Sequence, residues 1–156
     1  MYNLTTIELN SMNHIKISGG TASQRKYIES ITEFCIKTLM PRMSTLDISI
    51  KLCAPQGAMG YCLETDSNRT FEIEIDRKLT LRKLLETLAH EMVHVKQYAR
   101  RELHPVHQTW CGKTYNPKKV SYWDLPWEIE AHGREAGLFV RWAEQENVGH
   151  KKWAQV

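Results

Sequence analysis

The stretch LAHEMVHVKQ, Leu88 to Gln97, decides how the rest of the chain is interpreted. Its two histidines, His90 and His94, stand four residues apart, and Glu91 directly follows the first. Residues four apart lie on the same face of an α-helix, so both imidazoles would point to one place, as a shared zinc ion requires. Glu91 is turned from His90 by about 100° around the helix axis. Its carboxylate can therefore lie beside the metal without binding it.

The flanking sequence predicts that this stretch lies on a long helix. Thr80 is a good N-cap, and the apolar residues after it recur at helical spacing to about Leu103. The segment just before the helix, Phe71 to Asp76, alternates apolar and acidic residues and predicts a β-strand. We expect this strand to be an exposed sheet edge, along which an extended peptide can be added as a further strand.

The other segments complete an α+β domain. They predict a hairpin over Thr5–Leu9 and His14–Ser18, strands over Leu46–Cys53 and Ala58–Glu64, and helices from Thr21 or Ser23 to Met40 and from Pro126 to Gln145. The segment from His104 to Leu125 shows no period but carries aromatic residues, so we expect a long ordered loop. The predicted fold is a small, mostly antiparallel, twisted sheet packed on the two later helices. One domain is expected over residues 1–149, followed by a loose tail over 150–156.

The composition is that of an ordinary globular protein. The 156 residues are 42% hydrophobic and 25% charged, with a net charge of +3, which neither demands nor excludes nucleic acid. None of the four cysteines forms a C-x-x-C pair, so no zinc ribbon is indicated. The N-terminus lacks the features of a signal peptide, and no apolar run is long enough to span a membrane. We therefore expect a cytoplasmic protein with no membrane partner and no dedicated nucleic-acid module.

A catalytic zinc ion needs a third protein ligand and one open position. Tyr98 and Arg100 stand where two common spacings would place a third histidine. The better source is PWEIEAHGRE, Pro126 to Glu135, which offers Glu128 and Glu130. These two residues point about 200° apart on a helix, so one of them at most can face the metal. We expect Glu128 to be the ligand, with Glu130 as its rival.

HEMVH followed by a helix bearing E-x-x-A resembles the gluzincins, zinc metallopeptidases whose third ligand is a glutamate on a second helix. Glu128 to Ala131 fits that motif, whereas His132 stands where branches of the group often have Asp or Asn. The small size is similar to that of minigluzincins and of metallopeptidase-like proteins encoded by phages. The resemblance spans Phe71 to Val140, roughly half the chain. It implies a zincin-like fold, one zinc per chain held by His90, His94 and Glu128, and the cytoplasm of a phage-infected host as a possible location.

The expected activity is hydrolysis of a peptide bond in a peptide or protein substrate. A zinc-bound water would attack the carbonyl, and Glu91 would act as the general base. His107, Tyr115, Tyr122 and His132 are candidates for stabilising the oxyanion, and His132 could instead orient a ligand.

Two alternatives to this activity stay open. A catalytically silent zinc-binding interaction domain would not need Glu91. A SprT-like protease associated with nucleic acid would be expected to carry a third histidine and a zinc ribbon, which this sequence lacks.

Overall fold

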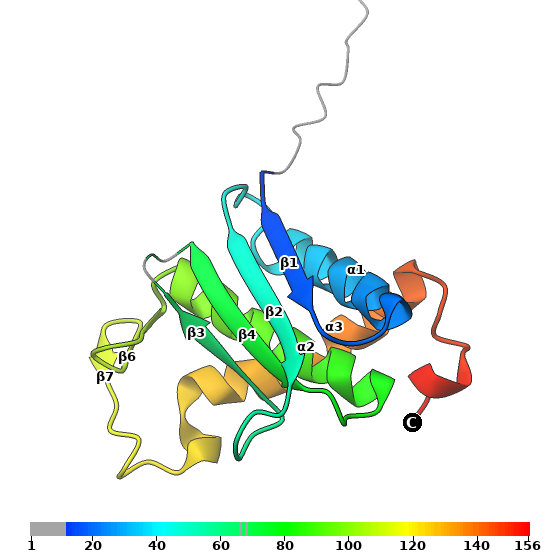
Figure 1. The fold of residues 1–156 in the computed structure, drawn as a ribbon. Coiled ribbons are helices and arrows are strands. Elements are labelled where there is room, and N and C mark those ends of the chain that lie inside the picture. The colour runs from blue at the N-terminus through cyan, green and yellow to red at the C-terminus, as the bar shows by residue number, and fades with distance from the viewer. Residues whose placement is uncertain (1–11, 66, 68) are drawn as a thin grey trace, which may run out of the picture.

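The structure, a computed structural model, describes residues 12–65, 67 and 69–156 (Figure 1). A four-stranded sheet forms one layer, and the helices lie together behind it in Figure 1, which confirms an α+β fold. The helices are α1 (Ala22–Leu39), α2 (Leu81–Ala99) and α3 (Pro126–Gln145). The strands of this sheet are β1 (His14–Ser18), β2 (Asp47–Cys53), β3 (Gly60–Glu64) and β4 (Thr70–Asp76).

The sheet is mixed, so the prediction of a mostly antiparallel sheet is wrong. Its order is β1-β2-β4-β3, with β1–β2 and β2–β4 parallel and β3–β4 antiparallel. The first parallel pair follows from α1, because a helical crossover returns the chain in the same direction. His14–Ser18 therefore pairs with β2, and the other strand of the predicted hairpin, Thr5–Leu9, lies outside the described residues.

The sheet edge near the later helices is β3. The prediction that Phe71 to Asp76 forms an exposed edge is wrong, because β4 lies between β2 and β3. Alternation of apolar and polar residues reports that a strand has one buried and one exposed face, and an interior strand of a one-sided sheet has this pattern too. Of the strands in the described part of this sheet, β3 and β1 are the two at its edges.

The main core lies between the sheet and the helices. The inward-facing side chains of β2 and β4 are fully buried against α1 and α2; they include Ile48, Ile50, Phe71, Ile73 and Ile75. The opposite face of the sheet carries polar residues such as Glu72 and Lys51, which are exposed. Because one face of the sheet is buried, the register of the strands determines which side chains point toward α2. These side chains form the surface on which α2 packs.

Local sequence explains where the helices begin and end. Thr21 and Gln24 form a reciprocal capping box at the start of α1. Thr80 occupies the N-cap of α2, although its side chain donates or accepts no capping hydrogen bond. Helix α2 ends earlier than predicted, because Arg101 adopts a left-handed conformation with φ of 59°. Pro126 is the first residue of α3. A backbone N–H at this position would have no hydrogen-bond partner within the helix, so proline is tolerated there.

The segment between α2 and α3 is more regular than the predicted loop. It contains a small antiparallel sheet of β5 (Leu103–His104), β6 (Thr109–Trp110) and β7 (Lys113–Thr114), followed by the short helix η1 (Tyr122–Asp124). Strands of two residues are too short to show a period in the sequence.

The residues after Gly149, the predicted loose tail, are mostly exposed, but Trp153 and Ala154 pack on the body of the protein. They include the short helix η2 (Lys152–Ala154). The Trp153 ring lies 5.1 Å from that of Tyr27, and the Arg82 guanidinium donates a hydrogen bond to the carbonyl of Ala154. An aromatic side chain that buries its ring against the core orders the segment that carries it.

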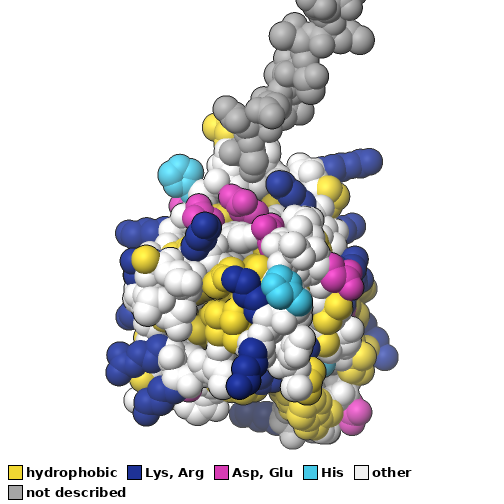
Figure 2. Space-filling model, turned by 90° about the vertical axis from the view of Figure 1, so that its right-hand side faces the viewer, with side chains coloured by type: hydrophobic (Ala, Val, Ile, Leu, Met, Phe, Trp, Pro, Cys, Tyr) yellow, Lys and Arg dark blue, Asp and Glu magenta, His cyan; other side chains and the backbone are white. Residues whose placement is uncertain are grey.

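The surface of the protein shows no concentration of positive charge on the face drawn in Figure 2. Lys and Arg side chains are spread around this face, and hydrophobic side chains occupy its centre. Among the described residues, no helix has the length and apolar character needed to cross a membrane.

Candidate metal centre

Helix α2 buries the HEMVH motif against the rest of the protein. His90, Glu91 and His94 are 7%, 4% and 8% exposed, respectively, although all three are polar. Helix α3 packs across α2 and brings Glu128, which is 9% exposed, to the same place. Polar side chains are buried at this density only where they are paired or bind a ligand.

Donor groups of three residues from the two helices lie close together. The Nε2 atoms of His90 and His94 are 3.2 Å apart. The Glu128 carboxylate oxygens lie 3.3 Å from Nε2 of His90 and 3.5 Å from Nε2 of His94. Ligands at the usual 2.0–2.1 Å from a tetrahedral zinc ion are about 3.3 Å from each other. The three separations are therefore of the length expected between neighbouring zinc ligands, with His90 and His94 each beside a different oxygen of Glu128.

The hydrogen bonds of the two imidazoles determine which nitrogens face this point. Nδ1 of His90 lies 2.7 Å from a Glu135 carboxylate oxygen, and Nδ1 of His94 lies 2.8 Å from the Gln97 amide oxygen. Both partners are acceptors, so both Nδ1 atoms carry the hydrogen. When both rings are neutral, each Nε2 atom carries a lone pair. This lone pair faces the other imidazole and the Glu128 carboxylate. Three lone-pair donors that face one another fit a bound cation.

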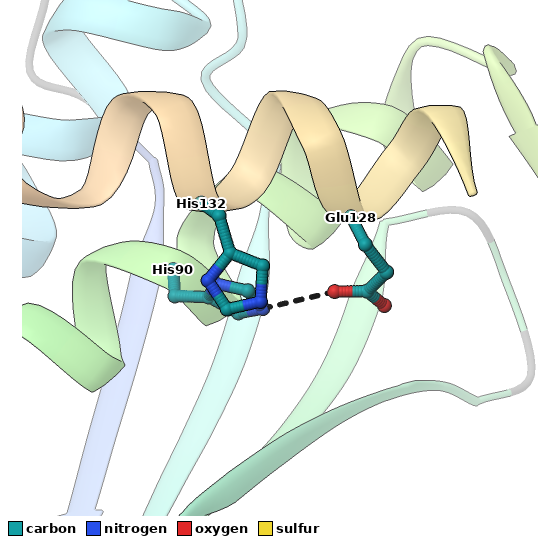
Figure 3. A group of neighbouring side chains, drawn as sticks. All are labelled: His90, Glu128 and His132. Atoms are coloured by element: carbon teal, nitrogen blue, oxygen red, sulfur yellow. Dashed lines mark ion pairs between the residues drawn. The ribbon is translucent and has the colours of Figure 1, made fainter. Parts of the chain in front are cut away.

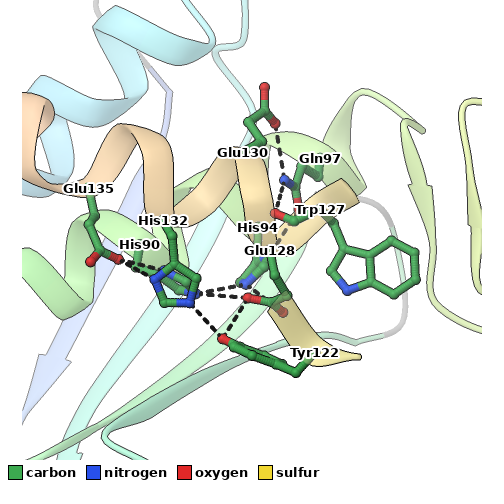
Figure 4. A network of polar contacts seen from close by, with 9 residues as sticks. All are labelled: His90, His94, Gln97, Tyr122, Trp127, Glu128, Glu130, His132 and Glu135. Atoms are coloured by element: carbon green, nitrogen blue, oxygen red, sulfur yellow. Dashed lines mark hydrogen bonds and ion pairs between the residues drawn. The ribbon is translucent and has the colours of Figure 1, made fainter. Parts of the chain in front are cut away.

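Glu130 points away from this centre. Its carboxylate lies 2.8 Å from the Lys96 ammonium group and 3.0 Å from the Gln97 amide nitrogen, on the far side of His94 (Figure 4). Of the two predicted candidates for the third ligand, the structure brings Glu128 to the histidines and pairs Glu130 with a lysine.

His132 lies beside the same centre. One donor atom each of His90, Glu128 and His132 fall within 4.8 Å of one another (Figure 3). Nε2 of His132 lies 2.9 Å from the Tyr122 hydroxyl oxygen, and that hydroxyl group donates to Glu128 over 2.8 Å. Nε2 of His94 lies 3.2 Å from Nε2 of His90 and has no hydroxyl partner, whereas Nε2 of His132 is hydrogen-bonded to the Tyr122 hydroxyl.

The cluster of acids and imidazoles shifts the ionisation of its members. Burial lowers the pKa of His90, but the hydrogen bonds with Glu128 and Glu135 outweigh it and raise that pKa to about 9. Burial also acts to lower the pKa of His94, but the hydrogen bond with Glu128 outweighs it, and the pKa of His94 is raised above its usual value. Burial raises the pKa of Glu91, and the two histidines offset part of this increase. For Glu128, hydrogen bonds from the histidines outweigh burial and lower the pKa well below its usual range.

A cleft of about 560 Å³ opens over the cluster. One wall is β3 with the residues just before it, Gly57 to Met59, and the floor is α2 from Lys83 to Tyr98. Glu91 lines the cleft, and among the described residues its carboxylate has no hydrogen-bond or ion-pair partner. Gly60 allows β3 to lie close to α2, because a Cβ atom at this position would lie only 2.9 Å from the methyl group of Thr87 on α2.

Two candidates for the oxyanion lie outside the cleft. His107 is exposed in the β5–β6 turn, where its ring stacks near that of His104, and Tyr115 contacts the Trp127 ring. Tyr122 and His132 do line the cleft.

Sequence reasoning did not assign Glu135 or Gln97 to the site. Their spacing is a usable indication, since Glu135 stands seven residues after Glu128 and Gln97 three after His94 on helix faces that point to the metal ligands. Comparisons of the chain with protein-family models, curated proteins and solved structures find no match.

Proposed function

We propose that the protein is a zinc-dependent metallopeptidase with a gluzincin-like centre. The single observation that carries the proposal is the convergence of His90 Nε2, His94 Nε2 and the Glu128 carboxylate, 3.2–3.5 Å apart, from two helices. Two imidazoles and one carboxylate are a known donor set of catalytic zinc sites, in which the fourth position stays open. The cleft reaches all three residues, so that position would face a substrate.

The residues of the chain divide the catalytic work. A zinc ion held by the three ligands would polarise a carbonyl group and acidify a water molecule. Glu91, which lines the same cleft, would accept the proton of the attacking water and deliver it to the leaving amine. Burial raises the pKa of Glu91 toward neutrality, which suits a group that must both accept and donate a proton.

Glu91 also favours an enzyme over a silent zinc-binding domain. Burying a carboxylate without a partner is costly, and zinc binding requires only the three ligands. Glu91 as a residue is only 4% exposed, its carboxylate has no hydrogen-bonding partner in the described part of the chain, and it lines the cleft. A purely structural role would not explain why an unpaired carboxylate is buried here, whereas a role in proton transfer would.

The free edge of β3 is the proposed binding site for an extended peptide. Asp76 donates to the Met59 carbonyl and Thr65 to that of Thr70, so the odd-numbered residues of β3 bond to β4. In an antiparallel pair the alternate residues direct their backbone groups to the other side. Gly60, Cys62 and Glu64 therefore offer N–H and C=O groups to a further strand, directly over α2.

Tyr122 and His132 are the proposed partners of the substrate carbonyl. The Glu128 carboxylate can only accept, so the Tyr122 hydroxyl donates to it, and Nε2 of His132 must donate to the hydroxyl oxygen. Both groups are hydrogen-bond donors at the edge of the cleft. On binding of a substrate, either can turn to a developing oxyanion, the role that preorganised donors fill in acyl transfer.

The two ends of the cleft differ in chemistry. Beyond His94 the lining is apolar and aromatic, with Tyr98, Leu103 and Trp127. Toward the start of α2 the lining includes Lys83 and Thr87. We therefore propose that the substrate places an apolar side chain beside Trp127 and a polar or acidic group near Lys83.

Metal content is the first test of this function. Mass spectrometry of wild type, Glu128→Ala and Glu91→Gln, after dialysis against zinc and removal of free metal, should give about one zinc per chain for wild type and Glu91→Gln. Glu128→Ala should lose it, because one of three ligands is gone. Cleavage of a mixed peptide library by wild type and not by Glu91→Gln would support a peptidase. Wild type that binds no zinc at saturation would refute the proposal.

A further inference from the structure

A largely buried polar network joins α2 to α3 beside His94, through side chains that do not line the cleft (Figure 4). The Gln97 amide nitrogen donates to the Trp127 carbonyl over 2.9 Å and to the Glu130 carboxylate over 3.0 Å. The Lys96 ammonium group donates to both oxygens of that carboxylate, over 2.9 and 2.8 Å. Gln97 is fully buried, and Lys96 is 6% exposed. The network connects the two helices that carry the proposed ligands, and Glu130, with a side chain 19% exposed, is its partly exposed member.

The two acceptors fix the orientation of the Gln97 amide. A backbone carbonyl and an ionised carboxylate can accept hydrogen bonds but not donate them, so both must face the amide NH₂ group. The amide oxygen is then left to point at Nδ1 of His94, 2.8 Å away. If the amide were rotated by half a turn, its oxygen would face two acceptors and its NH₂ group would face His94.

The Lys96–Glu130 ion pair supplies a strong reason for the network to keep this arrangement. A buried ammonium group must be paired, and Lys96 has Glu130 and, 2.8 Å from its nitrogen, an oxygen of Glu102. The contact with that Glu102 oxygen is an ion pair without hydrogen-bond geometry. Within the described residues, Glu130 is therefore the carboxylate that is hydrogen-bonded to both Lys96 and Gln97, and it is held as an acceptor.

We propose that Gln97 is a positioning residue for the zinc ligand His94, and that Lys96 and Glu130 hold Gln97 in the orientation that this role requires. The chain of contacts keeps the hydrogen of His94 on Nδ1, and it keeps Nε2 free and aimed at His90 and Glu128. This inference rests on the proposed zinc site. It gives Glu130, the sequence-based rival of Glu128, a distinct role one step removed from the metal.

A purely structural network makes a different prediction from a positioning network. If the contacts only tie α2 to α3, their loss destabilises the protein and leaves the zinc affinity of the folded fraction unchanged. If they position His94, their loss weakens zinc binding even where the metal-free fold is retained. Mutation of groups that orient a zinc-bound histidine typically weakens metal binding by about 10–100-fold.

The test measures zinc dissociation constants by competition with a chromophoric chelator, alongside urea unfolding of the metal-free proteins. Gln97→Met keeps the side-chain volume similar and removes both hydrogen-bonding groups; zinc binding should weaken by about 10–100-fold. The double variant Gln97→Glu/Glu130→Gln keeps an acceptor for Nδ1 and the net charge of the pair, and should recover at least half of the loss on a logarithmic scale. Cobalt(II) absorption should show a tetrahedral spectrum in wild type and the double variant and an altered one in Gln97→Met.

One control variant and one substitute variant complete the experiment. Ser30→Ala removes a polar contact between α1 and α3, the 2.9 Å hydrogen bond from the Trp142 indole, and should leave the zinc affinity unchanged. If Gln97→Met fails to fold, Glu130→Gln replaces it, because Lys96 then still has Glu102, and zinc binding should weaken about tenfold.

Three results would contradict the inference. If Gln97→Met bound zinc as tightly as wild type, or if the double variant bound it as weakly as Gln97→Met, the positioning role would be overturned and the proposed zinc site would be unaffected. No zinc binding by wild type would overturn both proposals together.

Discussion

Removal of metal should make the stability of the protein fall as the pH rises from 6.5 to 9, and His90 is the reason. In the metal-free protein the carboxylates of Glu128 and Glu135 raise the pKa of His90 from 6.5 to about 9. A group whose pKa is raised by folding stabilises the folded state fully below its unfolded pKa. That contribution is lost as the pH rises through the folded pKa. The window is therefore pH 6.5 to 9.

The magnitude follows from the same two values. At about 1.4 kcal/mol per pKa unit, the difference between 6.5 and about 9 corresponds to about 3 kcal/mol of unfolding free energy. Glu128 shares this interaction, but its contribution lies elsewhere: its pKa is lowered, so that stabilisation is lost as the pH falls below 4.5 and is constant across the window. Zinc must displace the proton, so its apparent affinity should instead increase about tenfold per pH unit within the window.

The assay is urea unfolding in the presence of a chelator at pH 6.5 and 9, on wild type and on His90→Asn. The wild type should lose about 3 kcal/mol more than the variant over this range, because the variant lacks the titrating ring. Zinc affinity of the wild type, measured at the same two pH values, should change in the opposite direction. Equal pH dependence of the two proteins, or a zinc affinity that does not change with pH, would refute the proposed ionisation of the cluster.

Further predictions concern the base, the substrate and the packing. Glu91→Gln should retain zinc and lose about 10²–10⁴-fold in turnover, the usual contribution of a general base, as measured with any cleaved library peptide. Peptide substrates N-methylated at successive positions should bind weakly at every second position near the scissile bond, because a strand paired to β3 uses alternate amides; an effect without this period would exclude pairing. Gly60→Val should cost about 1–3 kcal/mol in thermal unfolding and raise KM, since its Cβ atom would lie 2.9 Å from Thr87. Trp142→Ala should cost about 3–5 kcal/mol without changing zinc affinity, because Trp142 is fully buried away from the cleft.

Helical elements were the most predictable part of the fold. The periodicity of Tyr27 to Leu39 and the proline at 126 predicted α1 and α3 nearly to the residue. These features are local: a helix closes its hydrogen bonds within one turn, so its sequence holds most of the information. The same locality placed His90 and His94 on one face of α2.

The order of the strands was not predictable from local patterns. Whether Phe71 to Asp76 lies inside the sheet or at its edge depends on β2 and β3, which alternate in the same manner. The sequence of β4 reports its two faces and carries no information about its two neighbours. The edge beside the cleft was for this reason assigned to the wrong strand.

The orientation of side chains around the metal centre was predictable only in part. Helical geometry showed that Glu128 and Glu130 could not both face the histidines, and the contact of Glu130 with Lys96 then distinguishes them. That contact crosses from α3 to α2 and depends on how the helices are rotated. Helix rotation is set by packing of the whole core, which no single motif contains.

The segment that joins α2 to α3 has a consequence for the engineering of the protein. Leu103 at its start and Leu125 at its end are buried in one small apolar cluster, whereas the β6–β7 turn projects from it. The entropic cost of closing a loop rises by only about 0.6 kcal/mol for each doubling of its length. Insertions at Gly112, around which a Cβ atom would meet no neighbour, should thus leave the helices and their histidines in register. New recognition elements for chosen peptides can be grafted there, beside a cleft whose chemistry stays the same.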